Sequence, residues 1–175
     1  MDELAFLDLI QLNLRSAWLD AIMVPITMLG NAGAIWVVLG IMLICMRRYR
    51  RVGIAIIIAV VIAGALSKLV LGGLFPRLRP CDVNMAVQLA IERPFGTSFP
   101  SGHTAAAFAA VTVLIAERMP KGLVIPLAVL AVLIALSRLY LYVHYPTDVL
   151  VGAVLGVAIG VAVVKGLEAL APHQQ

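Results

Sequence analysis

The chain alternates between long apolar segments and short polar ones. Apolar residues dominate five segments, at about 21–46, 52–74, 104–116, 123–136 and 149–164. A helix that crosses a bilayer needs about 20 mostly apolar residues. The pattern therefore predicts an all-α fold, a polytopic membrane helical bundle of about five spans, in which the third and fourth spans are short.

Three local patterns refine this picture of one membrane domain over residues 1–175. Residues 1–19 mix leucines and isoleucines with aspartate, glutamine and asparagine, which is typical of a helix lying in the membrane interface. The run from Leu29 to Gly33 places two glycines and an asparagine inside the first span, which predicts a kink. Glycines recur every fourth residue in the last span, at Gly152, Gly156 and Gly160, which predicts close packing against a neighbouring helix.

Composition agrees with a membrane protein. Apolar residues make up 63% of the chain and charged residues 13%, against roughly 45–50% and about 25% in soluble domains. These values, with a mean hydropathy of +1.07, exclude an ordinary soluble enzyme, a disordered interaction protein and a disulfide-stapled secreted module. Cys45 and Cys81 have neither paired nor metal-binding spacing, so we expect two free thiols.

The positions of the basic residues predict the orientation of the spans. Arginines crowd residues 47–51, Arg118 and Lys121 separate the third and fourth spans, and Lys165 follows the fifth. By the positive-inside rule these ends face the cytoplasm. The net charge of +4 is dispersed among apolar runs and forms no basic face, so we expect no nucleic-acid partner.

The opposite ends of the spans carry arginines as well. Arg77, Arg79, Arg93 and Arg138 lie in or beside residues 75–103 and 137–148, on the expected extracytoplasmic side. The planar guanidinium fork matches phosphate oxygens, so these positions indicate an anionic ligand. Anchoring of span ends at the headgroup layer is the alternative.

Two further stretches on that side add acid–base groups. Pro100-Ser101-Gly102-His103 opens the third span, where backbone N–H groups at a helix N-terminus can face a phosphate and His103 can donate a proton. Ser137-Arg138 ends the fourth span, and His144 and Asp148 open the fifth. Asp148 can accept the imidazole N–H of His144, which leaves the other nitrogen free to attack phosphorus. A solvated His144 beside a helix-capping Asp148 is the alternative, but it leaves Ser137 and Arg138 unexplained.

The chemistry of these residues favours phosphoryl transfer without a metal or cofactor. The chain has no acidic cluster for magnesium. A zinc site of two histidines and one aspartate would leave the arginines unexplained.

In their order and spacing these motifs resemble the type 2 phosphatidic acid phosphatase (PAP2) superfamily of membrane lipid phosphatases. The resemblance covers about residues 20–165, and eight specified residues carry it: Pro100, Ser101, Gly102, His103, Ser137, Arg138, His144 and Asp148. It implies a metal-free site in a helical bundle, a phosphohistidine intermediate on His144, and a proton from His103 to the leaving group. It also implies that Arg79, Arg138, Ser101 and the Gly102 backbone hold the phosphoryl oxygens.

The first motif departs from the family pattern. The family has a lysine where this chain has Gly72, and Lys68 lies one helical turn earlier on the same face. We expect Lys68 to replace that lysine and to bind phosphate, and Arg77 is a further candidate that would supply the missing charge if Lys68 is structural. A purely structural Lys68 is the alternative.

The resemblance implies hydrolysis of a lipid phosphate at the extracytoplasmic face of the plasma membrane. The sequence around Phe99-Pro100-Ser101-Gly102-His103 is similar to that of bacterial members that convert undecaprenyl diphosphate to undecaprenyl phosphate. Phosphatidylglycerol phosphate and phosphatidic acid are the alternative substrates. A non-catalytic anionic-lipid transporter would need charges through the bilayer depth, where only Lys68 lies, and a vanadate-holding peroxidase fits the membrane setting poorly. The expected partners are the lipid substrate and membrane lipids. The sequence does not indicate an oligomeric state. We expect His173, near the C-terminal end of the sequence, to have no role.

Overall fold

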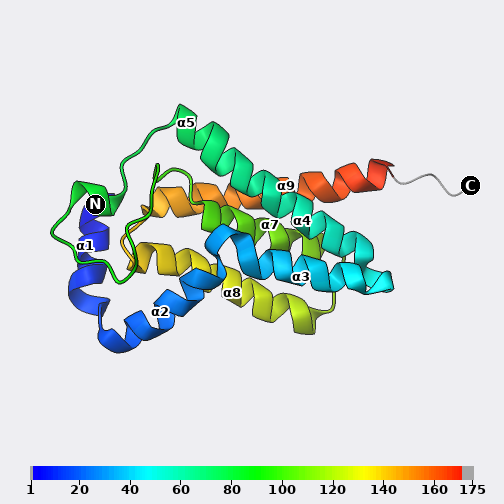
Figure 1. The fold of residues 1–175 in the computed structure, drawn as a ribbon, viewed down its shortest axis with the longest axis horizontal. Coiled ribbons are helices and arrows are strands. Elements are labelled where there is room, and N and C mark those ends of the chain that lie inside the picture. The colour runs from blue at the N-terminus through cyan, green and yellow to red at the C-terminus, as the bar shows by residue number, and fades with distance from the viewer. Residues whose placement is uncertain (1, 171–175) are drawn as a thin grey trace, which may run out of the picture.

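A computed structural model describes residues 2–170 of the chain, and every regular element in that range is a helix (Figure 1). The all-α prediction is therefore confirmed. Met1 and the tail that contains His173 lie outside the described residues. The helices are α1 (Glu3–Leu14), α2 (Ala17–Leu29), η1 (Asn31–Gly33), α3 (Ala34–Cys45), η2 (Arg47–Tyr49), α4 (Arg50–Ala65), the π-helical η3 (Leu66–Leu71), α5 (Gly72–Leu74), α6 (Pro80–Val83), α7 (Gly102–Ala116), α8 (Lys121–Tyr140) and α9 (Pro146–Leu170).

Three of the helical segments are long and apolar enough to cross a membrane: Arg47–Leu74, Lys121–Tyr140 and Pro146–Leu170. The bent pair α2 and η1–α3 makes a fourth if it is one span, and α7 is apolar but shorter. The count of about five spans therefore stays a prediction. Helices α7, α8 and α9 extend beyond the predicted segments, because their hydrogen-bonded turns continue into the flanking polar residues. The interfacial segment, predicted to end at residue 19, instead divides at residues 15–16 into α1 and the start of α2.

The predicted kink in the first span is present. Ala32 and Gly33 have positive φ values of 51° and 70°, and the helix axes on either side differ by 48°. A Cβ at Gly33 would lie 2.6 Å from Val60 of α4, so the chain can turn and pack here only without a side chain. The kink carries Asn31 toward the start of α7.

Helix α7 lies at the centre of the bundle and packs most extensively on α9. Its buried face is built largely of alanines that include Ala105 and Ala109. The α9 glycines face this surface, and a Cβ at Gly160 would lie 2.7 Å from the side chain of Thr112. The predicted close approach along the glycine stripe is therefore confirmed.

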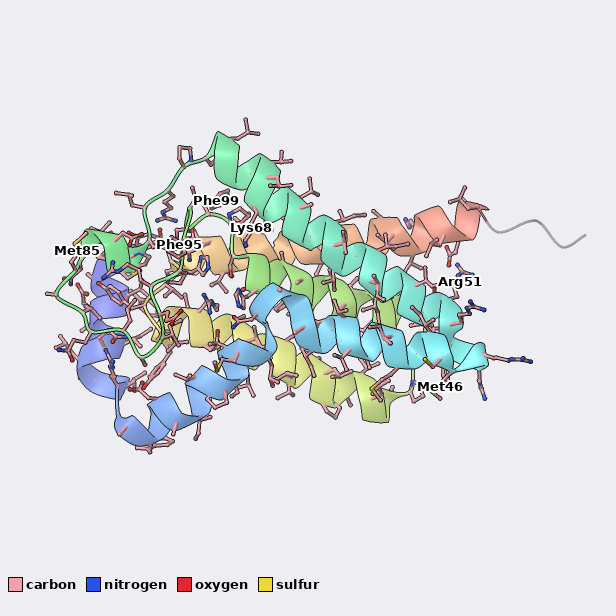
Figure 2. The ribbon with its side chains drawn as sticks, viewed as in Figure 1. Met46, Arg51, Lys68, Met85, Phe95 and Phe99 are labelled. Carbon is pink, nitrogen blue, oxygen red and sulfur yellow. The ribbon has the colours of Figure 1, made fainter. Side chains whose placement is uncertain are left out.

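The two ends of the bundle differ in character. Helix α1, α6 and the long 84–101 segment gather at one end, whereas the arginine-rich turn between α3 and α4 lies at the other (Figure 1). Figure 2 shows Met85 and Phe95 at the first end and Met46 and Arg51 at the second. All the motifs singled out for chemistry lie toward the first end.

Candidate active site

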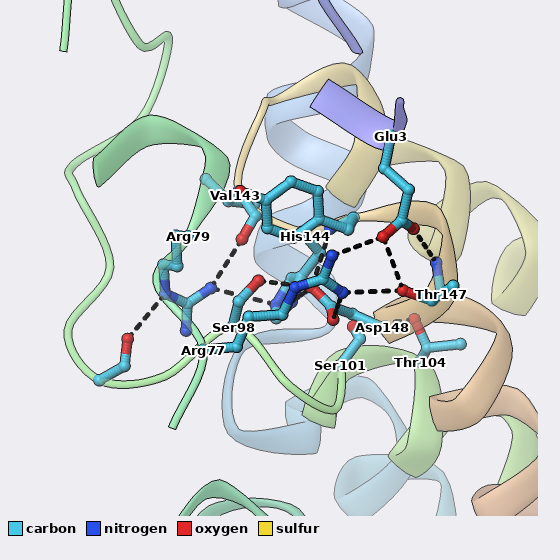
Figure 3. A network of polar contacts seen from close by, with 12 residues as sticks. Glu3, Arg77, Arg79, Ser98, Ser101, Thr104, Val143, His144, Thr147 and Asp148 are labelled. Carbon is cyan, nitrogen blue, oxygen red and sulfur yellow. Dashed lines mark hydrogen bonds and ion pairs between the residues drawn. The ribbon is translucent and has the colours of Figure 1, made fainter. Parts of the chain in front are cut away.

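His144 and Asp148 lie in and just after the turn that joins α8 to α9, and both are buried, at 3% and 0% exposure. The Nδ1 of His144 lies 3.6 Å from Oδ2 of Asp148, slightly beyond hydrogen-bond length. On the other side of the ring, Nη1 of Arg79 lies 3.2 Å from Nε2 (Figure 3). A guanidinium only donates, so Nε2 is the unprotonated nitrogen and Nδ1–H points toward the carboxylate.

The Asp148 carboxylate is held by three other donors. Oδ2 accepts the hydroxyl of Ser98 at 2.5 Å and the backbone N–H of Tyr145 at 2.8 Å. Oδ1 accepts Nη1 of Arg77 at 2.8 Å. These bonds fix the carboxylate in one orientation beside His144. Sequence reasoning missed Ser98, because nothing in the local pattern links it to a residue fifty positions later.

Two buried arginines face the same space as His144. Arg79 donates Nη1 to the backbone oxygen of Val143 at 2.9 Å and Nε to that of Gly96 at 3.1 Å. Arg138 is only 3% exposed, and its Nη1 donates to the hydroxyl of Thr27 at 2.5 Å. A cavity of about 510 Å³ opens in front of them, bounded among others by Lys68, Arg79, Gly102, His103, Arg138 and His144. We call it the phosphate cavity.

His103 enters this cavity from the first turn of α7. Its Nε2 lies 2.9 Å from Oδ1 of Asn31, which accepts the ring N–H. From the sequence, Asn31 was predicted only as part of a kink. The kink also has a use in the site, because it delivers an amide oxygen that orients His103.

The remaining predicted phosphate contacts fall into two groups. Gly102 and Lys68 line the phosphate cavity, and Figure 2 shows Lys68 on the helix beside it. A Cβ at Gly72 would lie 2.7 Å from Oγ1 of Thr97, so a lysine at position 72 would displace the segment around Thr97. Lys68, in contrast, reaches the cavity. The Ser101 hydroxyl is fully buried and accepts from Thr104 at 3.0 Å, outside the cavity lining.

Arg77 lies elsewhere than the sequence predicted. Its guanidinium donates to Asp148 at 2.8 Å and to Glu3 of α1 at 2.5 Å, and it lies 3.8 Å from the ring centroid of Tyr145. Two carboxylates hold it behind Asp148, so it does not line the phosphate cavity. The assignment of Arg77 to the phosphate is therefore corrected.

The electrostatics of the site favour a neutral imidazole at His144. Burial, together with the nearby charges of Arg138 and Arg79, lowers the pKa of His144 to about 4 against the opposing effect of Asp148. The imidazole is therefore neutral at pH 7, and its Nε2 accepts from Arg79 at 3.2 Å at the wall of the cavity. A neutral nucleophile, two buried cations and a second imidazole form an arrangement that can attack a phosphate and absorb its charge.

Comparison with known proteins identifies the family of the chain. The family model described as the PAP2 superfamily matches residues 48–171. An undecaprenyl-diphosphatase of Sulfolobus acidocaldarius is 35% identical over 144 residues, which are 80% of this chain and 66% of that protein. The chain thus spans about two thirds of that relative's length.

Two solved structures are similar over nearly the whole chain. Aquifex aeolicus LpxE has a TM-score of 0.72 at 32% identity, with 91% of this chain and 94% of that chain covered. A PAP2-type phosphatidylglycerolphosphate phosphatase from Bacillus subtilis has a TM-score of 0.76 at 26% identity, with 99% and 87% covered. The family match over most of the chain shows that this protein belongs to the PAP2 superfamily.

Proposed function

We propose that the chain is a metal-independent lipid phosphatase whose nucleophile is His144. The observation that carries the proposal is the single cavity that Nε2 of His144, His103 and two buried arginines face together. Among residues 2–170, no three His, Cys, Asp or Glu side chains gather in a way that could hold a metal ion. The proposed chemistry accordingly relies on guanidinium groups for charge stabilisation.

The reaction proceeds in two displacements. The Nε2 lone pair of His144 forms a bond to the terminal phosphorus while the bond between that phosphorus and the leaving oxygen breaks, and protonated His103 gives a proton to the departing oxygen. In a diphosphate the leaving oxygen belongs to the lipid phosphate, and in a monoester it belongs to the lipid alcohol. Asp148 stabilises the positive charge that develops on the imidazole. Water then attacks the phosphohistidine, His103 takes the proton, and the phosphorus–nitrogen bond breaks to release inorganic phosphate.

The arginines act on the equatorial oxygens of the phosphoryl group. Arg79 and Arg138 are buried and fixed by hydrogen bonds to Val143 and Thr27, so they require no reorganisation when charge builds up in the transition state. Lys68 and the Gly102 backbone line the same space. We propose that they complete the phosphate-binding group.

The position of the site supports a proposal for the membrane face, and the relatives support one for the lipid. The site lies at the end of the bundle opposite the arginine-rich turn at Arg47–Tyr49 (Figures 1 and 2), which by the positive-inside rule faces the cytoplasm. We propose an extracytoplasmic site in the plasma membrane. The favoured substrate is undecaprenyl diphosphate, after the Sulfolobus relative; phosphatidylglycerol phosphate is the second candidate, after the Bacillus structure.

A direct substrate comparison tests this function. Purified protein with EDTA present is offered undecaprenyl diphosphate and phosphatidylglycerol phosphate in the same detergent, and phosphate release is measured. We expect turnover of both, with the larger kcat/KM for the diphosphate. Turnover that appears only after magnesium is added would exclude the metal-independent mechanism, and absence of turnover with and without magnesium would exclude the phosphatase.

A further inference from the structure

A second cavity, of about 530 Å³, adjoins the phosphate cavity and has no role in the mechanism above. It is bounded by α2, the kink at Asn31 and the 90–95 segment. The two cavities share His103 and Arg138. The groups that protonate the leaving group and bind phosphate therefore face both spaces.

The polar groups of the second cavity are buried and incompletely paired. Arg138 is 97% buried, and its Nε has no hydrogen-bond partner among the described residues. An unpaired N–H on a buried cation is costly unless a ligand satisfies it. Thr27, 2% exposed, and Asn31 add a hydroxyl and an amide beside this guanidinium. At the rim, Glu92 and Arg93 are exposed and of opposite charge.

The chemistry of the reaction indicates what this cavity holds. His103 protonates the departing oxygen, so whatever that oxygen carries must occupy the space next to His103. In a monoester that group is carbon, whereas in a diphosphate it is a second phosphate. We propose that the second cavity binds the non-transferred phosphate of a diphosphate lipid, through Arg138, Thr27 and Asn31. This proposal rests on the proposed function and names the substrate class of the same site.

Binding of two small probes to the purified protein tests the subsite without turnover. Methylenediphosphonate resembles a diphosphate that cannot be cleaved, and methylphosphonate resembles a single phosphate. We expect calorimetry to give the diphosphonate at least a tenfold lower Kd. Thr27→Val should reduce that preference to less than threefold, because the hydroxyl lines only the second cavity. Thr27 also accepts a hydrogen bond from Arg138, so the methylphosphonate Kd should rise too, but by less than the diphosphonate Kd.

Two further variants keep the result interpretable. Thr112→Val removes the hydroxyl of a helical threonine whose side chain lies against Gly160, away from both cavities, and should leave both Kd values unchanged. Asn31→Ala should weaken the diphosphonate selectively even if Thr27→Val does not fold. Equal Kd values in the wild type, or equal losses for both probes in the variants, would overturn the subsite. The proposed function would then still stand on turnover of the lipids.

A separate observation concerns the network behind Asp148. Glu3 of α1 accepts from Nη2 of Arg77 at 2.5 Å and from the backbone N–H of Thr147 at 2.8 Å, and Arg77 donates to Asp148 at 2.8 Å. Figure 3 shows this chain of contacts reaching from α1 to the carboxylate. Partial burial raises the pKa of Glu3, but the hydrogen bonds from Arg77 and Thr147 outweigh it and lower the pKa below its ordinary value.

The geometry points to Glu3 and Arg77 as positioning residues for Asp148. Arg77 occupies Oδ1 of the carboxylate, which leaves Oδ2 directed at His144. Glu3 in turn holds the Arg77 guanidinium, which is also stacked on Tyr145. Through this relay the first helix of the chain holds the carboxylate that orients His144.

Steady-state kinetics distinguish this role from a phosphate contact. Arg77→Leu should lower kcat by 10- to 100-fold with less than threefold change in KM, and Arg77→Lys should recover part of the loss. Glu3→Gln should lower kcat by about threefold to tenfold alone and have no further effect in the Arg77→Leu background. Arg51→Leu, which breaks an ion pair with Glu117 at the opposite end, is the matched control with unchanged kinetics.

Two kinetic results would contradict a positioning role for Glu3 and Arg77. A raised KM with unchanged kcat in Arg77→Leu would show that Arg77 binds phosphate, as its place in the sequence suggested. Independent, multiplicative effects of the Glu3 and Arg77 changes would show that they do not act through one another. Either result overturns the relay.

Discussion

Replacing His144 with alanine should abolish turnover, with kcat falling by ~10⁴-fold or more, on the scale seen when the nucleophile of a catalytic unit is removed. The physical reason is that Nε2 of His144 is the only buried, unprotonated nitrogen that lies beside Arg79 in the described part of the site. Asp148→Asn keeps the shape but loses the charge that stabilises the imidazolium, and should cost about 10⁴-fold. Phosphate release from the lipid substrate is the measurement.

Trapping the intermediate tests the same claim independently of rate. Wild-type protein quenched during turnover of phosphate-labelled lipid should carry an acid-labile label. The sequence contains three histidines, so the label can be assigned fully. It should disappear in His144→Ala and persist in His173→Ala. Turnover without label, or label that remains in His144→Ala, would remove the phosphohistidine mechanism.

The pH dependence follows from the lowered pKa of His144. The nucleophile must be neutral, and its pKa is about 4. Protonation of His144 therefore lowers kcat/KM only as the pH falls through about 4, and the acidic limb of the pH profile should lie near that value. A histidine at its ordinary pKa would lose activity near pH 6.5.

The sequence predicted the parts of the site that lie close together along the chain. His144 and Asp148 are four residues apart, and Gly102 and His103 open one helix, so local geometry already places each pair. The helices were predictable for a similar reason, because runs of apolar residues in a membrane protein satisfy the backbone only as helices or closed barrels. Boundaries shifted where helical turns continued into polar residues.

The contacts that sequence reasoning missed join residues far apart. Asn31 meets His103 and Thr27 meets Arg138 only because the first span kinks and lies against α7 and α8. Glu3 reaches Thr147 across 144 positions. Arg77 was misplaced because an arginine near a span end has the same local pattern whether it meets a phosphate or a carboxylate.

Replacing His103 with alanine should have the second large effect, and its size should depend on the leaving group. In the proposed mechanism His103 supplies a proton to the departing oxygen, and such general acid catalysis contributes about 10²–10⁴-fold. A lipid alkoxide or phosphate needs that proton, whereas a nitrophenolate departs without it. We therefore expect a loss of at least 100-fold with the lipid and less than tenfold with nitrophenyl phosphate.

Asn31 makes this prediction sharper, since it holds the ring of His103 through Nε2 at 2.9 Å. Asn31→Ala should show the same dependence on leaving group at reduced size, because the acid is present but less well oriented. Equal losses with both substrates in His103→Ala would assign this imidazole to phosphate binding instead, since binding to the transferred phosphoryl group does not depend on what leaves. The ratio of the two kcat/KM values, rather than either value alone, therefore decides the role of His103.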